Sequence, residues 1–368
     1  MRSTVVAFSF LVSVHLTPAC SDPKTESELV DASVSQYIPE PFDTDYEVSE
    51  VIAGNDREAD SGFDVNLESQ ADSDLQADSD LQTNSETDTG VDQLGNLTMC
   101  QKWNNIWSLS SAISWNGSTQ SCDAGTVNHE TLDTVLALTN FYRELATLPL
   151  VTLEMTQAEA LQQCALMMEA NNRLSHQPPD SWSCYHSDGA YMASQSNLAG
   201  SNAIDAVAMY MIDPGNETTM GHRRWIMSQG LESIGVGSTN AYSCMSVLHL
   251  NRPRAWVAFP PPGEFPLQAT QDRWGRSIDQ TGWTIQYDGL SLANAQVTIK
   301  VYANDISNDP GEELPIELVD LMPNFGSSAA YNIIPQGWRS EVGKRYEVKL
   351  VSGNEMITYS VEFVDCDQ

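Results

Sequence analysis

The stretch GHRRWIM at residues 221–227 decides how the rest of this 368-residue chain is interpreted. It is followed by IGVGS at 234–238, where apolar residues alternate with small ones as they do in a strand. Within the stretch, Trp225 and Ile226 are expected to anchor the segment in a core, and Arg223 or Arg224 can pair with a nearby Asp or Glu. The role of His222 is open, because a histidine there can ligate a metal, act as a base or hold a helix end in place.

Helical patterns precede this stretch. LDTVLALTNFYREL at 132–145 places apolar residues at helical spacing, and Pro149 ends the pattern. QAEALQQCALMMEANN at 157–172 predicts a second helix, which ends shortly before His176. A third helix is expected to begin at Asn202, because asparagine is a favourable N-cap residue.

The helices and the strands after them predict an α+β domain over residues 99–262. This region resembles the CAP superfamily of cysteine-rich secretory proteins, venom allergens and plant pathogenesis-related proteins, and is most similar to bacterial members. The resemblance rests on an ordered series of motifs: NFYREL followed by LPL, NNRLSH, SNLA, IDPGN, GHRRWIM and IGVG. It implies a three-layer α-β-α sandwich with a central cleft.

The resemblance also implies a set of cleft residues, two histidines and two acids, which bind a divalent metal in some members. By position, His176 and His222 match the histidines and Asp213 matches one acid, whereas Ser196 stands where the family has the other acid. Zinc bound by His176 and His222 is one expectation, and the missing carboxylate should weaken it. The alternative is that the two histidines hydrogen-bond across the cleft and fix its walls.

A catalytic cleft is a further alternative. Ser196 beside His176 or His222 would suggest a Ser-His hydrolase, with Asp213 or Asp188 as the orienting acid. However, QSNLA is not the nucleophile elbow of such enzymes, and GHRRW lacks the second histidine and the glutamate of a zinc protease helix. We therefore expect binding rather than catalysis.

The first 20 residues are typical of an export signal, with Arg2 before an apolar run at 5–16 and the ending TPAC. Because Ala19 directly precedes Cys20, a bacterial lipoprotein signal with lipid attached to Cys20 is expected. An ordinary signal peptidase site is the alternative. No later apolar run approaches the ~20 residues of a membrane span, so the lipid would be the only membrane contact.

Residues 21–98 contain 21 acidic residues against two basic ones and carry much of the net charge of −33. The segment ADSDLQ occurs twice in succession, at 71–76 and 77–82. Low hydrophobicity with high net charge predicts a disordered acidic linker. The charge also argues against a nucleic acid partner, since phosphates would be repelled.

Seven cysteines leave six for disulfides once Cys20 is set aside, and three disulfides indicate an oxidising compartment. Proximity along the chain favours three pairs, although other pairings stay open: Cys100–Cys122, Cys164–Cys184 and Cys244–Cys366. The segment between the first two cysteines would then be a closed loop. Its tryptophans, Trp103, Trp107 and Trp115, are expected to serve packing, and a carbohydrate or aromatic platform is the alternative.

Residues 263–368 have a different pattern, with short alternating segments separated by turns: GWTIQYDG, AQVTIKVYA, RYEVKLVSG and MITYSVEFVD. They predict an all-β immunoglobulin-like sandwich. Trp274, Trp283 and Trp338 are expected to pack in its core rather than to form a sugar-binding platform.

The expected function is that of an exported protein of the bacterial cell envelope, lipid-anchored or secreted. Its cleft would bind a small lipid-like ligand, an extracellular protein or a glycan without catalysis. Two alternatives remain, and fold alone does not decide between them. One is a metal-assisted or Ser-His hydrolase that uses His176 and His222, and the other is an adhesion or structural protein acting through the β-sandwich.

Overall fold

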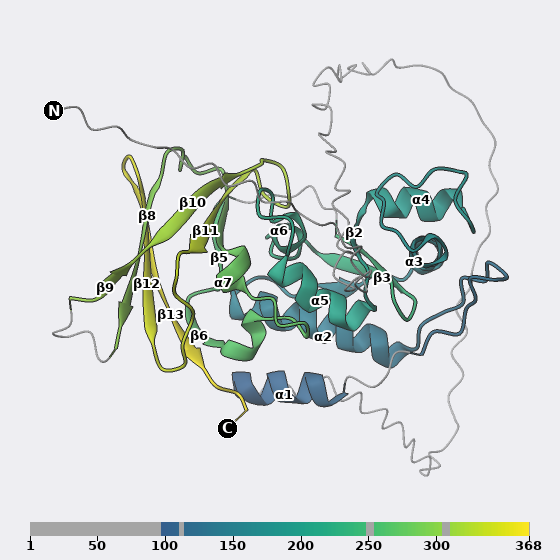
Figure 1. Ribbon diagram of the computed structural model, residues 1–368, viewed down its shortest axis with the longest axis horizontal. Coiled ribbons are helices and arrows are strands. Elements are labelled where there is room, and N and C mark those ends of the chain that lie inside the picture. The colour runs from purple at the N-terminus through teal and green to yellow at the C-terminus, as the bar shows by residue number, and fades with distance from the viewer. Residues whose placement is uncertain (1–96, 110–113, 248–253, 304–309, 368) are drawn as a thin grey trace, which may run out of the picture. The chain divides into compact units, whose positions relative to one another are not determined.

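The computed structural model describes residues 97–109, 114–247, 254–303 and 310–367 (Figure 1). The predicted signal segment, the lipid site at Cys20 and nearly all of the acidic linker lie outside these residues. Within the described part, no helix combines the length and the apolar character needed to cross a membrane.

Six helices belong to the N-terminal half of the described chain. They are α1 (Met99–Leu109), α2 (His129–Leu145), α3 (Ala158–Asn171), α4 (Ser187–Ser194), α5 (Ala203–Ile212) and α6 (Gly221–Ile226). The three helices expected from periodicity are confirmed as α2, α3 and α5. Helix α5 begins where predicted, because the side chain of Asn202 accepts a hydrogen bond from the Asp205 N–H.

A four-stranded sheet lies between these helices. Its strands are β1 (Thr152–Leu153), β2 (Ser196–Ala199), β3 (Ser233–Ser238) and β4 (Ser243–Ser246), in the order β1-β3-β4-β2. Helices α3 and α4 pack on one face, and α5, backed by α2, packs on the other (Figure 1). Successive side chains of a strand point to opposite faces of the sheet. Cys244 packs with residues of α3, and Met245 packs with residues of α5. The expected three layers are therefore present.

Glycine lets α3 approach this sheet closely. A Cβ atom at Gly237 in β3 would overlap the backbone carbonyl of Leu161 in α3. The small residues of IGVGS therefore allow the main chains of helix and strand to come into contact.

Nine strands follow: β5 (Ala255–Phe259), β6 (Gly263–Pro266), β7 (Trp283–Asp288), β8 (Gln296–Tyr302), β9 (Glu312–Leu314), β10 (Ile316–Leu321), β11 (Ala329–Pro335), β12 (Arg345–Ser352) and β13 (Glu355–Val364). They form two sheets, β10-β11-β7-β5 and β6-β13-β12-β8-β9, with every pairing antiparallel except β6 with β13. Two short helices, η2 (Leu267–Thr270) and α7 (Ile278–Thr281), connect β6 to β7. This is the β-sandwich predicted for the C-terminal part.

The predicted domain boundary at residue 262 does not coincide with the division between the sheets. Strand β5 pairs with β7, and β6 pairs with β13, so both belong to the C-terminal sheets. Aromatic rings run across this junction, from Tyr142 to Phe259 at 5.9 Å, on to Phe265 at 5.4 Å, and then to Phe363 at 6.2 Å. The two halves therefore share one continuous hydrophobic core.

The disulfides form, but all three predicted pairs are wrong. The bonds are Cys100–Cys366, Cys122–Cys184 and Cys164–Cys244, with Cα–Cα distances of 4.9, 5.0 and 6.2 Å. The first pair fails because residues after Cys100 form helix α1 instead of a closed loop, and Trp103 on that helix packs against Phe141. The last bond forms because α3 crosses β4, which places Cys164 over Cys244.

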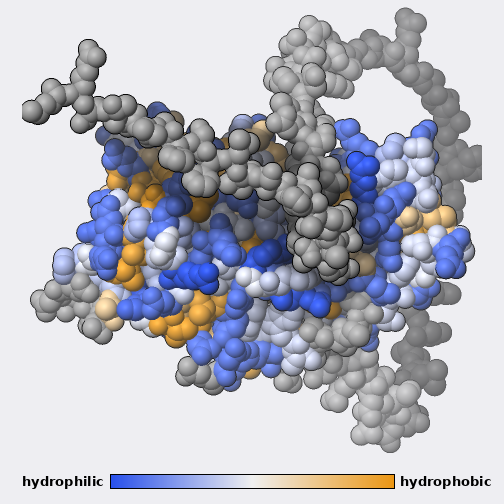
Figure 2. Space-filling view, viewed as in Figure 1, coloured by the Kyte–Doolittle hydropathy of each residue, from blue (hydrophilic) through white to orange (hydrophobic). Residues whose placement is uncertain are grey.

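The tryptophan expectations hold in part. Trp283 is fully buried, and Trp338 packs against its ring at 5.7 Å. Trp274 is half exposed, because it lies in a turn closed by the bridge between Gln271 and Ser277. On the face shown in Figure 2, hydrophilic residues predominate and hydrophobic ones form small separate patches, the ordinary pattern for a surface in water.

Candidate functional site

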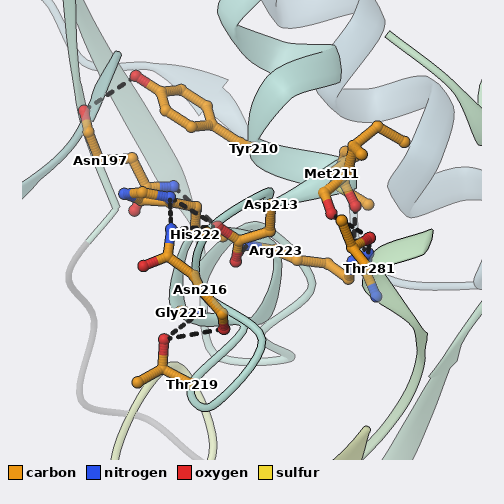
Figure 3. A network of polar contacts seen from close by, with 12 residues as sticks. Asn197, Tyr210, Met211, Asp213, Asn216, Thr219, Gly221, His222, Arg223 and Thr281 are labelled. Carbon is orange, nitrogen blue, oxygen red and sulfur yellow. Dashed lines mark hydrogen bonds and ion pairs between the residues drawn. The ribbon is translucent and has the colours of Figure 1, made fainter. Parts of the chain in front are cut away.

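Asp213 and His222 form the centre of the site (Figure 3). Asp213 ends α5 in the left-handed conformation, with a φ of 56°, and its side chain is fully buried. Its Oδ1 accepts hydrogen bonds from Nδ1 of His222 at 2.8 Å and from Nδ2 of Asn216 at 2.9 Å, and its Oδ2 accepts one from the Arg223 N–H at 3.3 Å. The turn IDPGN and the helix GHRRWI therefore act as one structural unit.

Asn197 connects strand β2 to this unit. The side-chain amide of Asn197 donates to the backbone carbonyl of His222 at 3.1 Å, and the backbone carbonyl of Asn197 accepts a hydrogen bond from the Tyr210 hydroxyl at 3.1 Å. The Tyr210 ring lies 5.2 Å from the ring of His222. Burial raises the pKa of Tyr210 well above its ordinary value, so this residue acts as a neutral hydrogen-bond donor.

His176 approaches the site from the segment after α3. Its Nδ1 donates to the carbonyl of Ala193 at 2.8 Å. The residue as a whole is exposed, but its ring is partly shielded from water, and this desolvation lowers the pKa of His176. The hydrogen bond to the Ala193 carbonyl raises the pKa, and the charge of His222 lowers it. His222 is therefore close enough to affect His176 electrostatically.

Ser196 lies at the start of β2 and is buried. Its hydroxyl has no hydrogen-bond partner among the described residues, although almost all buried hydroxyls have one. Among the described residues no hydrogen bond joins His176 to His222. Each histidine instead donates from its Nδ1 to a separate acceptor. In the neutral ring the lone pair of Nε2 can then accept a hydrogen bond.

A metal ion does not fit this set of donors well. A catalytic zinc has three protein ligands, whereas Asp213 uses its Oδ1 to hold Nδ1 of His222, which is the position of an outer-shell partner and not of a third ligand. The described residues contain no group of three or more histidine, cysteine, aspartate or glutamate side chains placed to hold an ion. Asp188, the alternative orienting acid, is exposed in the first turn of α4, and its one side-chain hydrogen bond comes from Ser187.

Arg223 has a role that the sequence analysis missed. Its guanidinium is fully buried and donates to backbone carbonyls on both sides: Met211 at 2.6 Å, Ile212 at 3.1 Å and Gly282 at 2.8 Å. Burial lowers the pKa of Arg223 to about 9, while the charge of Asp213 raises it. Among the described residues the Arg223 guanidinium makes no ion pair with an acidic side chain, and its further acceptor is the Thr281 hydroxyl at 3.4 Å.

Arg224 makes a parallel connection and is also fully buried. Its Nη1 donates to the carbonyls of Thr219 at 3.0 Å and Met322 at 2.7 Å, and its Nη2 donates to the carbonyl of Ser327 at 3.0 Å. Arg224 therefore connects the segment before α6 to residues that flank β10 and β11 of the C-terminal sheet. Two adjacent arginines inside an apolar segment were the sequence signal for this connection.

Residues 136–250 match the family model described as CAP, the cysteine-rich secretory protein family. The chain carries a CAP domain. Among solved structures it is similar to an extracellular protein containing a SCP domain from Bacillus anthracis strain Ames, at 19% identity and a TM-score of 0.26, over 32% of this chain and 40% of that chain. The chain thus spans less than half the length of that protein. No curated protein matches it.

The CAP domain and the three disulfides of the described chain are features of an exported or extracellular protein. Of the residues predicted for the CAP cleft, the structure brings Asp213 and His222 into contact. It places His176 within electrostatic range of His222 and buries Ser196 on β2.

Replacing His222 with asparagine is expected to raise the pKa of His176, because one of the influences that lowers it is the charge of His222. Proton NMR of the His176 C2–H during a pH titration measures this. The matched control is His129→Asn, at the exposed start of α2. An equal His176 pKa in all three proteins would show that the two rings do not share a cleft.

The same pKa gives the sign of a stability change. Because the folded pKa of His176 lies below its ordinary value of 6.5, the unfolded chain binds more protons as the pH falls through that value. His176 therefore contributes stability above this pH, and the contribution is lost as the pH falls toward the folded pKa.

Proposed function

We propose that this protein binds a small extracellular ligand in the CAP cleft, through His176, His222 and Ser196, without catalysing a reaction. The observation that carries the proposal is the fixed orientation of both imidazoles. Each Nδ1 donates to an oxygen of the protein, so each Nε2 is left as an acceptor.

The chemistry of the cleft favours a ligand with hydroxyl groups. A ligand hydroxyl can donate to Nε2 of either histidine, and it can accept from the buried Ser196 hydroxyl, which has no partner in the described chain. The CAP family resemblance adds lipid-like molecules as candidates. A sterol or fatty alcohol combines such a head group with an apolar body.

The hydrolase alternative has less support. The pair formed by Asp213 and His222 resembles the orienting acid and base of a triad. However, the Ser196 hydroxyl is not hydrogen-bonded to either histidine, so the serine has no base to activate it.

Attachment to the cell envelope is part of the proposal. It rests on the export signal and on Cys20 directly after Ala19. A lipid at Cys20 followed by the acidic linker would place the CAP domain outside the membrane. Labelling with tritiated palmitate in wild type and in Cys20→Ala tests this attachment.

The binding test uses dehydroergosterol and hexadecanol as probes, with the full chain exported into an oxidising compartment. His222→Ala and Ser196→Ala are each expected to lower the affinity for the probe about tenfold, which corresponds to about 1.4 kcal/mol for one lost hydrogen bond. His129→Ala is the matched control and should bind like wild type, because His129 lies outside the cleft.

Equal affinity in all four proteins, or no binding of either probe, would contradict the proposal. Hydrolysis of p-nitrophenyl esters provides the separate check on catalysis. A rate that falls in Ser196→Ala while folding is retained would favour the hydrolase.

A further inference from the structure

A second hollow lies where the ends of β1, β3 and β4 meet α3 and α4. Its volume is about 240 Å³, and its lining does not include the three proposed ligand contacts or Asp213. Gln195 is part of the lining although it directly precedes Ser196. The hollow is thus next to the CAP cleft in sequence but is lined by other side chains.

The apolar part of this hollow consists of two buried residues, Met192 and Val247, each about 2% exposed. The Val247 N–H donates to the backbone carbonyl of Gln195 at 3.4 Å, which ties the end of β4 to the end of α4. Two side chains give too little apolar surface to enclose a lipid chain.

Tyr191 supplies an aromatic ring to the hollow and is 63% exposed, among the most exposed large hydrophobic residues in the described chain. Within the described residues its side chain makes no hydrogen bond and its ring meets no other aromatic ring or cation. An exposed ring of this kind is available to stack on a ligand.

Several polar groups around the hollow keep free hydrogen-bonding capacity. The side chains of Gln157 and Ser233 make no hydrogen bond to other described residues. Gln195 uses its Nε2 on the Ser194 hydroxyl at 3.0 Å, which leaves its Oε1 as an acceptor. Glu154 accepts the Thr156 N–H on Oε1 at 2.7 Å, and its carboxylate has further lone pairs to offer a ligand.

The charge of the hollow disfavours anionic ligands. Hydrogen bonds from Thr156 lower the pKa of Glu154, so the carboxylate is ionised at neutral pH and repels anions. Amides, hydroxyls and one carboxylate around an exposed aromatic ring can bind sugar hydroxyls while the ring covers an apolar C–H face. The volume is below the ~300–1,000 Å³ of sites for drug-sized ligands, so it suits one sugar ring.

We propose that this hollow binds a single neutral sugar unit of an extracellular glycan, with the ring stacked on Tyr191 and its hydroxyls bonded to Glu154 and Gln195. The site is independent of the CAP cleft. A protein of this kind would engage a glycan on one side of α4 and a small ligand in the cleft.

The test is saturation-transfer difference NMR on the full chain, with glucose, galactose, mannose and N-acetylglucosamine as probes. We expect transfer to at least one sugar. Tyr191→Ala should weaken the affinity for that sugar at least tenfold, and Gln195→Ala should weaken it about threefold, as for stacking and a single hydrogen bond. Tyr191→Phe should bind like wild type, because it keeps the ring.

Two controls separate this site from others. Trp274→Ala removes a different exposed aromatic residue, 50% exposed, and should leave sugar binding unchanged. His222→Ala alters the CAP cleft alone and should also leave sugar binding unchanged. A failure of the proposal for the cleft therefore does not decide the proposal for the sugar site. The saccharide site is overturned if no sugar of the panel shows transfer, or if Tyr191→Ala binds as well as wild type.

Discussion

Replacing Arg223 with methionine is expected to lower the free energy of unfolding by about 3–5 kcal/mol. The guanidinium is fully buried and satisfies the carbonyls of Met211, Ile212 and Gly282. Methionine fills a similar volume but donates no hydrogen bond, so the carbonyls of Met211 and Gly282 lose their side-chain donor, at about 1–3 kcal/mol for each group left unsatisfied, while Ile212 keeps the Thr281 hydroxyl. Urea unfolding of the full chain, followed by tryptophan fluorescence, measures the loss.

Arg273→Met is the matched control, since it makes the same chemical change at the surface. Arg273 is more than half exposed and pairs with Asp205 at the start of α5. Such exposed ion pairs contribute about 0–1 kcal/mol, so this variant should unfold close to wild type. If Arg223→Met were as stable as Arg273→Met, the buried carbonyl bonds would not hold the two halves together.

Arg223→Lys separates charge from geometry. A lysine ammonium keeps the positive charge, but as a compact group on a flexible chain it cannot replace the fixed fork of a guanidinium at three carbonyls. We expect the stability of Arg223→Lys to lie between those of wild type and Arg223→Met.

The helices of the CAP domain were predictable because their signals are local. In α5 the cap residue Asn202 and a run of apolar residues specify a start and a buried face without reference to the rest of the chain. Asp213 and His222 are also only nine residues apart, so a turn and a short helix suffice to bring them together.

The role of the arginines could not be predicted in the same way. An acidic partner leaves a trace in the sequence, whereas every residue has a backbone carbonyl and any of them can accept from a guanidinium. The carbonyl of Gly282 lies 59 residues from Arg223 along the chain, and only the packing of the two halves brings them together.

Disulfide pairing depends on the same long-range packing. Cys164 is nearer in sequence to Cys184 than to Cys244, but α3 lies across the sheet and turns Cys164 toward β4. The sheet that β5 joins could not be predicted for a related reason. Residues 255–259, AWVAF, form a continuous apolar run, and such a run does not specify which sheet the strand joins.

Ending the chain after residue 262 is expected to abolish cooperative folding of the CAP domain. The truncation removes Cys366, so Cys100 loses its disulfide partner. It also removes the carbonyls of Gly282 and Met322, which accept hydrogen bonds from the two buried arginines. Loss of a disulfide costs about 2–5 kcal/mol, and an unpaired buried charge costs about 3–5 kcal/mol. Together these exceed the margin of many domains.

Far-UV circular dichroism and limited proteolysis of the exported proteins measure this result. The matched control deletes residues 40–90, a segment of the acidic linker chosen because its composition cannot build a core. That deletion should leave the unfolding transition unchanged, although it removes a segment about half as long as the one removed by the truncation.

The hydrophobic core makes the same prediction independently. Without residues 263–368, Phe259 loses its contact with Phe265, and strand β5 loses β7, its hydrogen-bonded neighbour. Phe259 would then face water, together with the Tyr142 ring that packs on it. A cooperative, protease-resistant fold in residues 1–262 would therefore show that the CAP domain holds His222 and Asp213 without the sandwich. Its absence would mean that the sandwich is part of the framework of the cleft.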